Sequence, residues 1–201
     1  MSILPARCFL SDRHGASAAE FALVVILFVI FIFGTIDFGR ALWEWNQAQR
    51  ATAVGARFAV VNDMAASSWQ NFDALGCVGN GLVVPVACLP GGANPNVCTS
   101  AVNCTNGARN NTAFTAIVTE MQKVYPALTA ANVEVEYRHI GLGFAGDPYG
   151  ADIIPAVTVR LRNMVFDFVT PGLVGMVSIT MPNFAATLTG EDSRTGAPPI
   201  L

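Results

Sequence analysis

The sequence predicts an α+β fold in which one long N-terminal transmembrane helix is followed by a small head with one helix and an antiparallel sheet. Three observations support this prediction. Residues 16–36 form an apolar run with a single charged residue, no proline occurs from there to Asn62, and the runs 133–138 and 156–162 alternate between apolar and polar residues. Apolar runs of that length cross bilayers, and a period of two is typical of half-buried strands.

Length and composition limit the head to one domain. Of the 201 residues, those after Asn62 number about 140, which is enough for one modest core. The net charge is −3 and the basic residues are scattered, so the sequence lacks the basic patch of a nucleic-acid-binding protein. The expected divisions are a short cytoplasmic segment at 1–15, a transmembrane helix at 16–36, a helix extension at 37–62, a Gly/Pro/Cys loop region at 63–111, the α+β head at 112–190 and a flexible tail at 191–201.

The transmembrane segment contains one acidic residue near its start. At about 1.5 Å of rise per residue, the stretch from Ala16 to Ile36 is long enough for one crossing. Glu20 is the only charged residue in it. An ionised carboxylate in hydrocarbon costs several kcal/mol unless it has a partner or reaches the interface. Glu20 therefore either pairs with a group on a neighbouring molecule or extends to the headgroups.

The helix extension carries small residues at helical spacing. Trp43 and Trp45 follow the apolar run, as expected where a helix passes the headgroups. Two rows of small residues then recur at every fourth position: Ala48, Thr52 and Ala56, and beside them Ala51, Gly55 and Ala59. Such rows allow another backbone to approach closely. That backbone belongs either to the chain's own head or to a neighbouring subunit, and the sequence does not choose between them.

The cysteines lie on both sides of the transmembrane segment. Cys8 precedes it, and four more follow it: Cys77, Cys88, Cys98 and Cys104. With Arg7 and Arg13 on the cytoplasmic side, the four lie in an oxidising compartment, so we expect two disulfides with three possible connectivities. A zinc site is the competing interpretation, but the spacing contains no CxxC pair. We therefore interpret the segment 65–111 as a disulfide-stapled loop, in which Pro85 favours an edge strand or extended loop.

The head is predicted from periodicity. Apolar residues at helical spacing predict a helix over 112–124 that ends before Pro126. The alternating runs predict two paired strands separated by a Gly-rich loop, with Glu134 and Glu136 opposite Arg160 and Arg162 on the polar face. A short amphipathic piece at 166–174 and a last run at 177–188 complete the head.

The sequence offers little for catalysis. Of its two histidines, His14 precedes the apolar run and His139 borders the Gly-rich loop. Asp147 and Asp152 in that loop are expected to be turn residues, since a calcium loop needs more oxygen ligands. An enzyme would have to assemble an unusual site from Asp147, Asp152 and His139. We therefore predict a protein that is not an enzyme, with no catalytic or metal site, no cofactor and no small-molecule substrate.

The most specific signal is the combination of Gly15, four small residues, the pair Glu20-Phe21 and a long apolar helix. Here the sequence resembles the TadE-like pseudopilins of the bacterial tight-adherence (Tad/Flp) pilus system. The stretches 35–60 and 179–194 are also similar to that family's membrane-exit helix and closing strand. Two features depart from its pattern, because many members have a proline early in the apolar run and the four-cysteine loop is an addition.

The resemblance implies that a prepilin peptidase cuts after Gly15, that Ala16 becomes the N-terminus, and that Glu20 and Phe21 act in recognition and assembly. In pilins the new α-amino group of one subunit can pair with the glutamate of a neighbour, which lowers the cost of burying either charge. The implied protein is a non-enzymatic minor pilin-like subunit in the bacterial inner membrane, with its N-terminus cytoplasmic and its head periplasmic. Its partners would be the membrane, the peptidase and other pilin-like subunits. The alternative is an unprocessed, signal-anchored binding protein with a disulfide-stapled head.

Overall fold

The computed structural model describes residues 13–70, 72–75, 84–92, 94–101, 103–143, 153–169 and 177–190. The chain divides into two compact units, Met1–Leu42 with Phe166–Ile179, and Trp43–Val165 with Thr180–Leu201. Helix α1, Arg13–Val61, begins in the first unit and ends in the second. Residues 1–12 of the expected leader at 1–15 and the expected tail at 191–201 lie outside the described residues.

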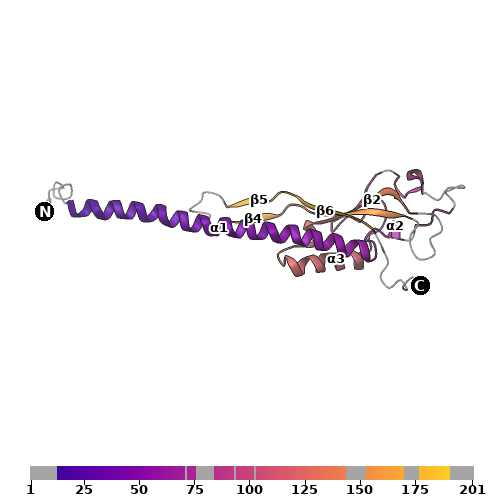
Figure 1. Cartoon of the computed structure of the whole chain (residues 1–201), viewed down its shortest axis with the longest axis horizontal. Coiled ribbons are helices and arrows are strands. Elements are labelled where there is room, and N and C mark those ends of the chain that lie inside the picture. Colours follow the sequence, from indigo (N-terminus) through magenta and orange to yellow (C-terminus); the bar gives the residue numbers. More distant parts are fainter. Residues whose placement is uncertain are drawn as a thin grey trace, which may run out of the picture. The chain divides into compact units, whose positions relative to one another are not determined.

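The first unit contains the N-terminal part of α1 and most of a two-stranded sheet. This sheet consists of β4, Val165–Asp167, and β5, Ser178–Thr180. Figure 1 shows the two strands beside α1. The Phe168 N–H donates to the Val177 carbonyl at 3.2 Å, so the two segments stay paired beyond the strands. Of the predicted amphipathic piece at 166–174, residues 166 and 167 belong to β4, residues 168 and 169 follow the strand, and residues 170–174 lie outside the described residues.

The second unit contains an antiparallel sheet of four strands in the order β1-β2-β3-β6. The strands are β1 Asn96–Thr99, β2 Val133–Leu142, β3 Ile154–Leu161 and β6 Phe184–Thr189. Val135 pairs with Val159, and Val157 pairs with Leu188. One face of β2 and β3 therefore carries the apolar side chains of both predicted alternating runs, because side chains alternate between the faces of a strand.

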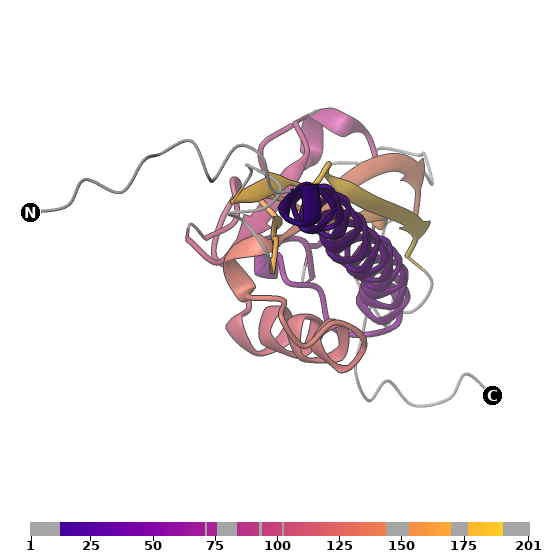
Figure 2. The same ribbon diagram turned by 90° about the vertical axis from the view of Figure 1, so that its left-hand side faces the viewer.

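Helix α3, Asn111–Val124, packs beside the C-terminal part of α1, as Figures 1 and 2 show. The Asn110 side chain caps α3 by accepting the Ala113 N–H at 3.2 Å, which satisfies one of the free donors at a helix start. At the other end of α3, the Tyr125 hydroxyl donates to Glu44 of α1 at 3.2 Å. Burial, together with the charge and hydrogen bond of Glu44, raises the pKa of Tyr125 to about 12.

The small residues of α1 are covered by the chain's own head. All six are buried, and a Cβ added to Gly55 would lie 2.6 Å from the Met121 sulfur and 3.3 Å from a methyl carbon of Val159. Met121 belongs to α3 and Val159 to β3, so α1 contacts both elements at this glycine. The sequence left open whether these residues pack on the chain's own head or on a neighbouring subunit. In the structure they pack on the chain's own head.

The strand pairing predicted from the charges is confirmed. Glu134 pairs with Arg160 in the sheet register. The Arg160 guanidinium lies 3.1 Å from Glu134 and also contacts Glu136, and Arg162 lies 2.8 Å from Glu134. Burial alone would lower the pKa of Arg160, but the hydrogen bonds and charges of the two glutamates outweigh it and raise the pKa.

The loop segment is more ordered than expected. It contains a helical turn α2, Ser67–Gln70, a 3-10 turn η2, Val86–Cys88, and the edge strand β1. Around Pro85 we expected an edge strand or an extended loop, and this was wrong for Val86–Cys88, which form the 3-10 turn η2. β1 was missed because its four residues show no clear alternation and form a strand only by pairing with β2. The last predicted run, 177–188, is divided into β5 and β6 around Pro182, which has no backbone N–H to donate.

Candidate assembly site

The residues expected at the cleavage and assembly site lie on the first turns of α1. Gly15, Glu20 and Phe21 are exposed, and the Phe21 side chain is 71% accessible. A Cβ added to Gly15 would meet no atom within 4 Å. Ala16 and Glu20 are four positions apart, so they share one helix face with about 6 Å of rise between them. Glu20 forms no ion pair with any side chain that the structure describes.

The helix above Glu20 presents an uncovered apolar surface. Long apolar side chains are exposed along this stretch, for example Leu23, Phe28 and Phe31 at 64%, 62% and 68%. The helix contains a window with a mean hydropathy of 2.7, and it is long and apolar enough to cross a membrane. An apolar surface of this extent needs lipid or other helices as its environment. This helix suggests that the chain has a single-pass membrane anchor.

A second acidic residue, Asp37, marks the end of the apolar run and was not singled out in the sequence analysis. Its side chain is only 2% exposed. Its carboxylate accepts the Val169 N–H at 3.1 Å and lies 3.4 Å from the Arg40 guanidinium. Arg40 in turn lies over the Phe166 ring, 5.3 Å from its centroid. The sequence signal was an acid directly after an apolar run with an arginine three positions later, but the partner Val169 is 132 positions away.

The two tryptophans after the apolar run differ in their surroundings. Trp43 is 66% exposed, as expected of a residue at the headgroup level. Trp45 instead packs edge-on against Phe184 of β6, with the ring centroids 5.1 Å apart. Trp45 therefore contributes to the packing of α1 on the head.

The structure describes the cysteines at positions 88, 98 and 104. Cys98 and Cys104 form a disulfide that closes a short loop after β1. Cys88 is also disulfide-bonded, and Cys77 and Cys8 lie outside the described residues. Of the three connectivities that the sequence left open, only one contains the Cys98–Cys104 bridge.

The residues considered for catalysis do not form a site in the described part of the chain. His139 Nε2 lies 3.1 Å from the Val84 carbonyl, which ties β2 to the loop segment. Asp147 and Asp152 lie outside the described residues. Within the described ranges no group of three or more His, Cys, Asp or Glu side chains is arranged to hold a metal ion.

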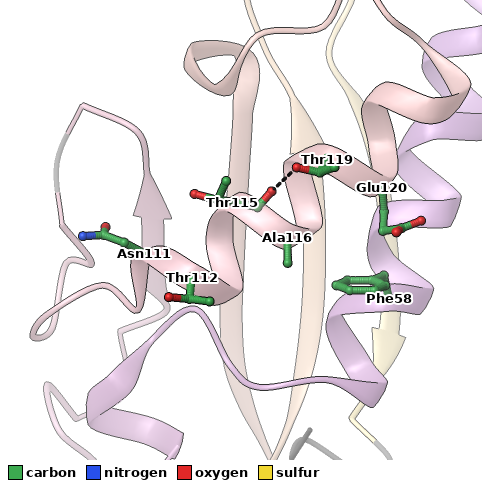
Figure 3. Close-up of a pocket in the computed structure, with 7 residues that line it drawn as sticks. All are labelled: Phe58, Asn111, Thr112, Thr115, Ala116, Thr119 and Glu120. Carbon is green, nitrogen blue, oxygen red and sulfur yellow. Dashed lines mark hydrogen bonds between the residues drawn. The ribbon is translucent and has the colours of Figure 1, made fainter.

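A hollow of about 510 Å³ lies between the end of α1 and the outer face of α3 (Figure 3). Phe58 lines it from α1, and the other lining residues belong to α3: Asn111, Thr112, Thr115, Ala116, Thr119 and Glu120. The Thr119 hydroxyl donates to the Thr115 carbonyl at 2.9 Å, so it is engaged by its own helix. The lining contains hydroxyls, one amide and one carboxylate but no nucleophile paired with a base.

Comparisons with known proteins bear on the N-terminal segment. The family model described as TadE-like protein matches residues 15–57. No curated protein and no solved structure matches the chain. The match begins at Gly15 and includes Glu20, Phe21, Asp37 and the buried small residues up to Ala56. The match covers the N-terminal part of the chain and does not extend to residues 58–201. Over residues 15–57, the N-terminal segment of this chain is similar to the TadE-like family.

Proposed function

We propose that this chain is a pseudopilin, a minor pilin-like subunit of a tight-adherence secretion and pilus-assembly system. A prepilin peptidase removes the leader after Gly15, and the mature protein assembles through its apolar N-terminal helix. The observation that carries the proposal is that the TadE-like match begins at Gly15 and continues through an exposed apolar helix. A side chain at Gly15 would meet no described atom within 4 Å of its Cβ, which suits a residue whose role is to be recognised by a protease.

The proposed orientation places the N-terminus in the cytoplasm and the head in the periplasm. The Cys98–Cys104 disulfide supports this orientation, because disulfides persist in oxidising compartments and are rare in the cytosol. Arg13 before the apolar helix supports it as well, since basic residues are favoured on the cytoplasmic side. We expect the inner membrane of a bacterium as the site of insertion.

Glu20 has a physical role in this proposal. Cleavage after Gly15 creates an ammonium group at Ala16, one turn from Glu20. When apolar helices pack side by side, the ammonium of one subunit can pair with the Glu20 carboxylate of another, and this pairing offsets part of the cost of burying each charge. Glu20 would therefore favour a neighbour placed in the correct register.

The decisive experiment determines the N-terminal sequence of the protein from cells with and without the prepilin peptidase. We expect a chain that begins at Ala16 in the first case and an uncut leader in the second. Gly15→Leu should block cleavage, whereas Gly39→Leu should leave it intact, since an added Cβ at either glycine meets no atom within 4 Å. An uncut leader in both strains would refute processing and favour the signal-anchored binding protein.

A second experiment tests Glu20 separately from cleavage. Glu20→Gln should leave the N-terminus at Ala16 but abolish cross-links between the transmembrane helices of neighbouring pilin-like subunits. Glu120→Gln is the matched control, because Glu120 lies on the surface of α3 beside Lys123. Unchanged cross-linking in the Glu20→Gln variant would show that the carboxylate has no part in assembly.

A further inference from the structure

The paired segments 165–169 and 177–180, which we call the arm, contain both buried and exposed apolar side chains. Phe166 is fully buried, and Phe168 contacts it edge-on with ring centroids 5.3 Å apart. Val169 and Val177, at the ends of the two segments, are 62% and 72% exposed. Two strongly exposed valines on a two-stranded ribbon need an explanation, since exposure of such side chains to water is unfavourable by about 1 kcal/mol or more each.

The arm is fixed to α1 at one level. The Val169 N–H donates to the Asp37 carboxylate at 3.1 Å, and Phe166 lies under the Arg40 guanidinium. Phe168 and Val177 are joined by a backbone hydrogen bond, so Val177 lies opposite Phe168, which directly precedes Val169. Both valines are therefore held at the turn of α1 that contains Asp37.

That turn is where the apolar helix ends. Asp37 follows Ile36, the last residue of the apolar run, and the stretch from Ser17 to Ile36 rises about 30 Å, the thickness of the hydrocarbon core. Ile36 and Phe38 on this turn are themselves 52% and 66% exposed. The exposed valines of the arm thus continue the apolar surface of the helix at the level where the helix leaves the bilayer.

We propose that the arm is a membrane-contacting element that inserts Val169 and Val177 into the headgroup boundary of the leaflet nearer the head. Asp37 holds the arm in place, and the Val169 N–H and Arg40 satisfy its carboxylate at a depth where an unpaired charge is costly. The second attachment point would restrict rotation and tilt of α1 relative to the bilayer. The proposal rests on membrane insertion of α1 and not on cleavage after Gly15.

The test uses the full, uncleaved chain in vesicles made of equal parts phosphatidylethanolamine and phosphatidylglycerol. In a Cys8→Ser background, Val177→Cys is labelled with an environment-sensitive fluorophore, while the disulfides remain oxidised. Val61→Cys is the matched control, because Val61 is also an exposed valine but lies at the opposite end of α1 from the apolar run. Lipids with a quencher near the headgroup should quench the label at 177 roughly twofold more than the label at 61.

Two variants examine the role of Asp37. Asp37→Asn keeps an acceptor for the Val169 N–H and should preserve quenching at 177, whereas Asp37→Ala removes the acceptor and should lower it to the level at 61. A label at Phe28→Cys, within the apolar run, confirms that α1 remains inserted in each variant. Equal quenching at 177 and 61 in the otherwise unaltered chain would overturn the proposal.

A second copy of this chain is the other possible cover for the valines, and dilution distinguishes it. Quenching at 177 that is unchanged as the protein-to-lipid ratio falls supports contact with lipid. If the label at 177 is shielded from the lipid quencher at a high protein-to-lipid ratio and this shielding disappears on dilution, a neighbouring subunit covers the valines. That result would overturn the proposal. Because the leader is present throughout, failure of the processing claim would leave these results unaffected.

Discussion

The close approach of α1 to the head at Gly55 allows a quantitative prediction for Gly55→Ala. The new Cβ would lie 2.6 Å from the Met121 sulfur and 2.7 Å from its Cγ. Met121 is fully buried and has little room to move, so we expect an overpacking cost of about 1–3 kcal/mol. Alanine is favoured over glycine inside a helix by about 1 kcal/mol. The net effect is a destabilisation of about 1 kcal/mol.

The assay is urea unfolding of the full chain in detergent micelles, followed by near-UV circular dichroism. Gly39→Ala is the control, because a Cβ at Gly39 meets nothing within 4 Å and should not lower stability. In a Met121→Ala background the collision is absent, so Gly55→Ala should stabilise by about 1 kcal/mol. If Gly55→Ala stabilises the unaltered protein as much as it stabilises Met121→Ala, the close packing of α1, α3 and β3 inferred here is wrong.

Three further predictions concern the head. Tyr137→Phe should cost about 1–3 kcal/mol at neutral pH, because it leaves the buried Ala65 N–H without its acceptor. Burial raises the pKa of Tyr137, so the stability linked to its neutral form is complete below about pH 10 and is lost above it. The difference in the free energy of unfolding between Tyr137→Phe and the parent, measured with urea, should therefore become smaller at alkaline pH. Arg160→Met should cost about 2–4 kcal/mol, because it leaves two partly buried glutamates without their shared partner, whereas Lys123→Met in an exposed pair should cost no more than about 0.5 kcal/mol in the same assay. Replacing Cys98 and Cys104 together by alanine should lower stability by about 2 kcal/mol, since their disulfide closes a short loop, and an unchanged urea midpoint would contradict this.

Several elements could be predicted because their signals are local. The apolar residues of α3 repeat every three or four positions, and the runs that form β2 and β3 alternate strictly. The pairing of these two strands was predictable too, since glutamates on one strand matched arginines on the other. Each signal arises within one segment, or between two segments with complementary charge, and needs no knowledge of the rest of the chain.

Other features could not be predicted because their causes lie far away in the sequence. β1 is a strand only because β2, about 40 positions later, supplies its hydrogen-bond partners. The Asp37 carboxylate is buried because a backbone N–H from residue 169 reaches it. A backbone donor has no side-chain signature, so the sequence contains no pattern that points to this contact.

The sequence by itself determined the membrane-length helix, the position of Glu20 near its start and the candidate cleavage point at Gly15. These follow from composition and order within about 25 consecutive residues, and transfer from water to lipid depends on that local composition. Only the tertiary structure decided that the small residues of α1 are covered by α3 and β3 of the same chain, and that the arm is attached at Asp37. Both depend on which distant segments meet, and a small residue or a lone carboxylate permits several partners until packing selects one.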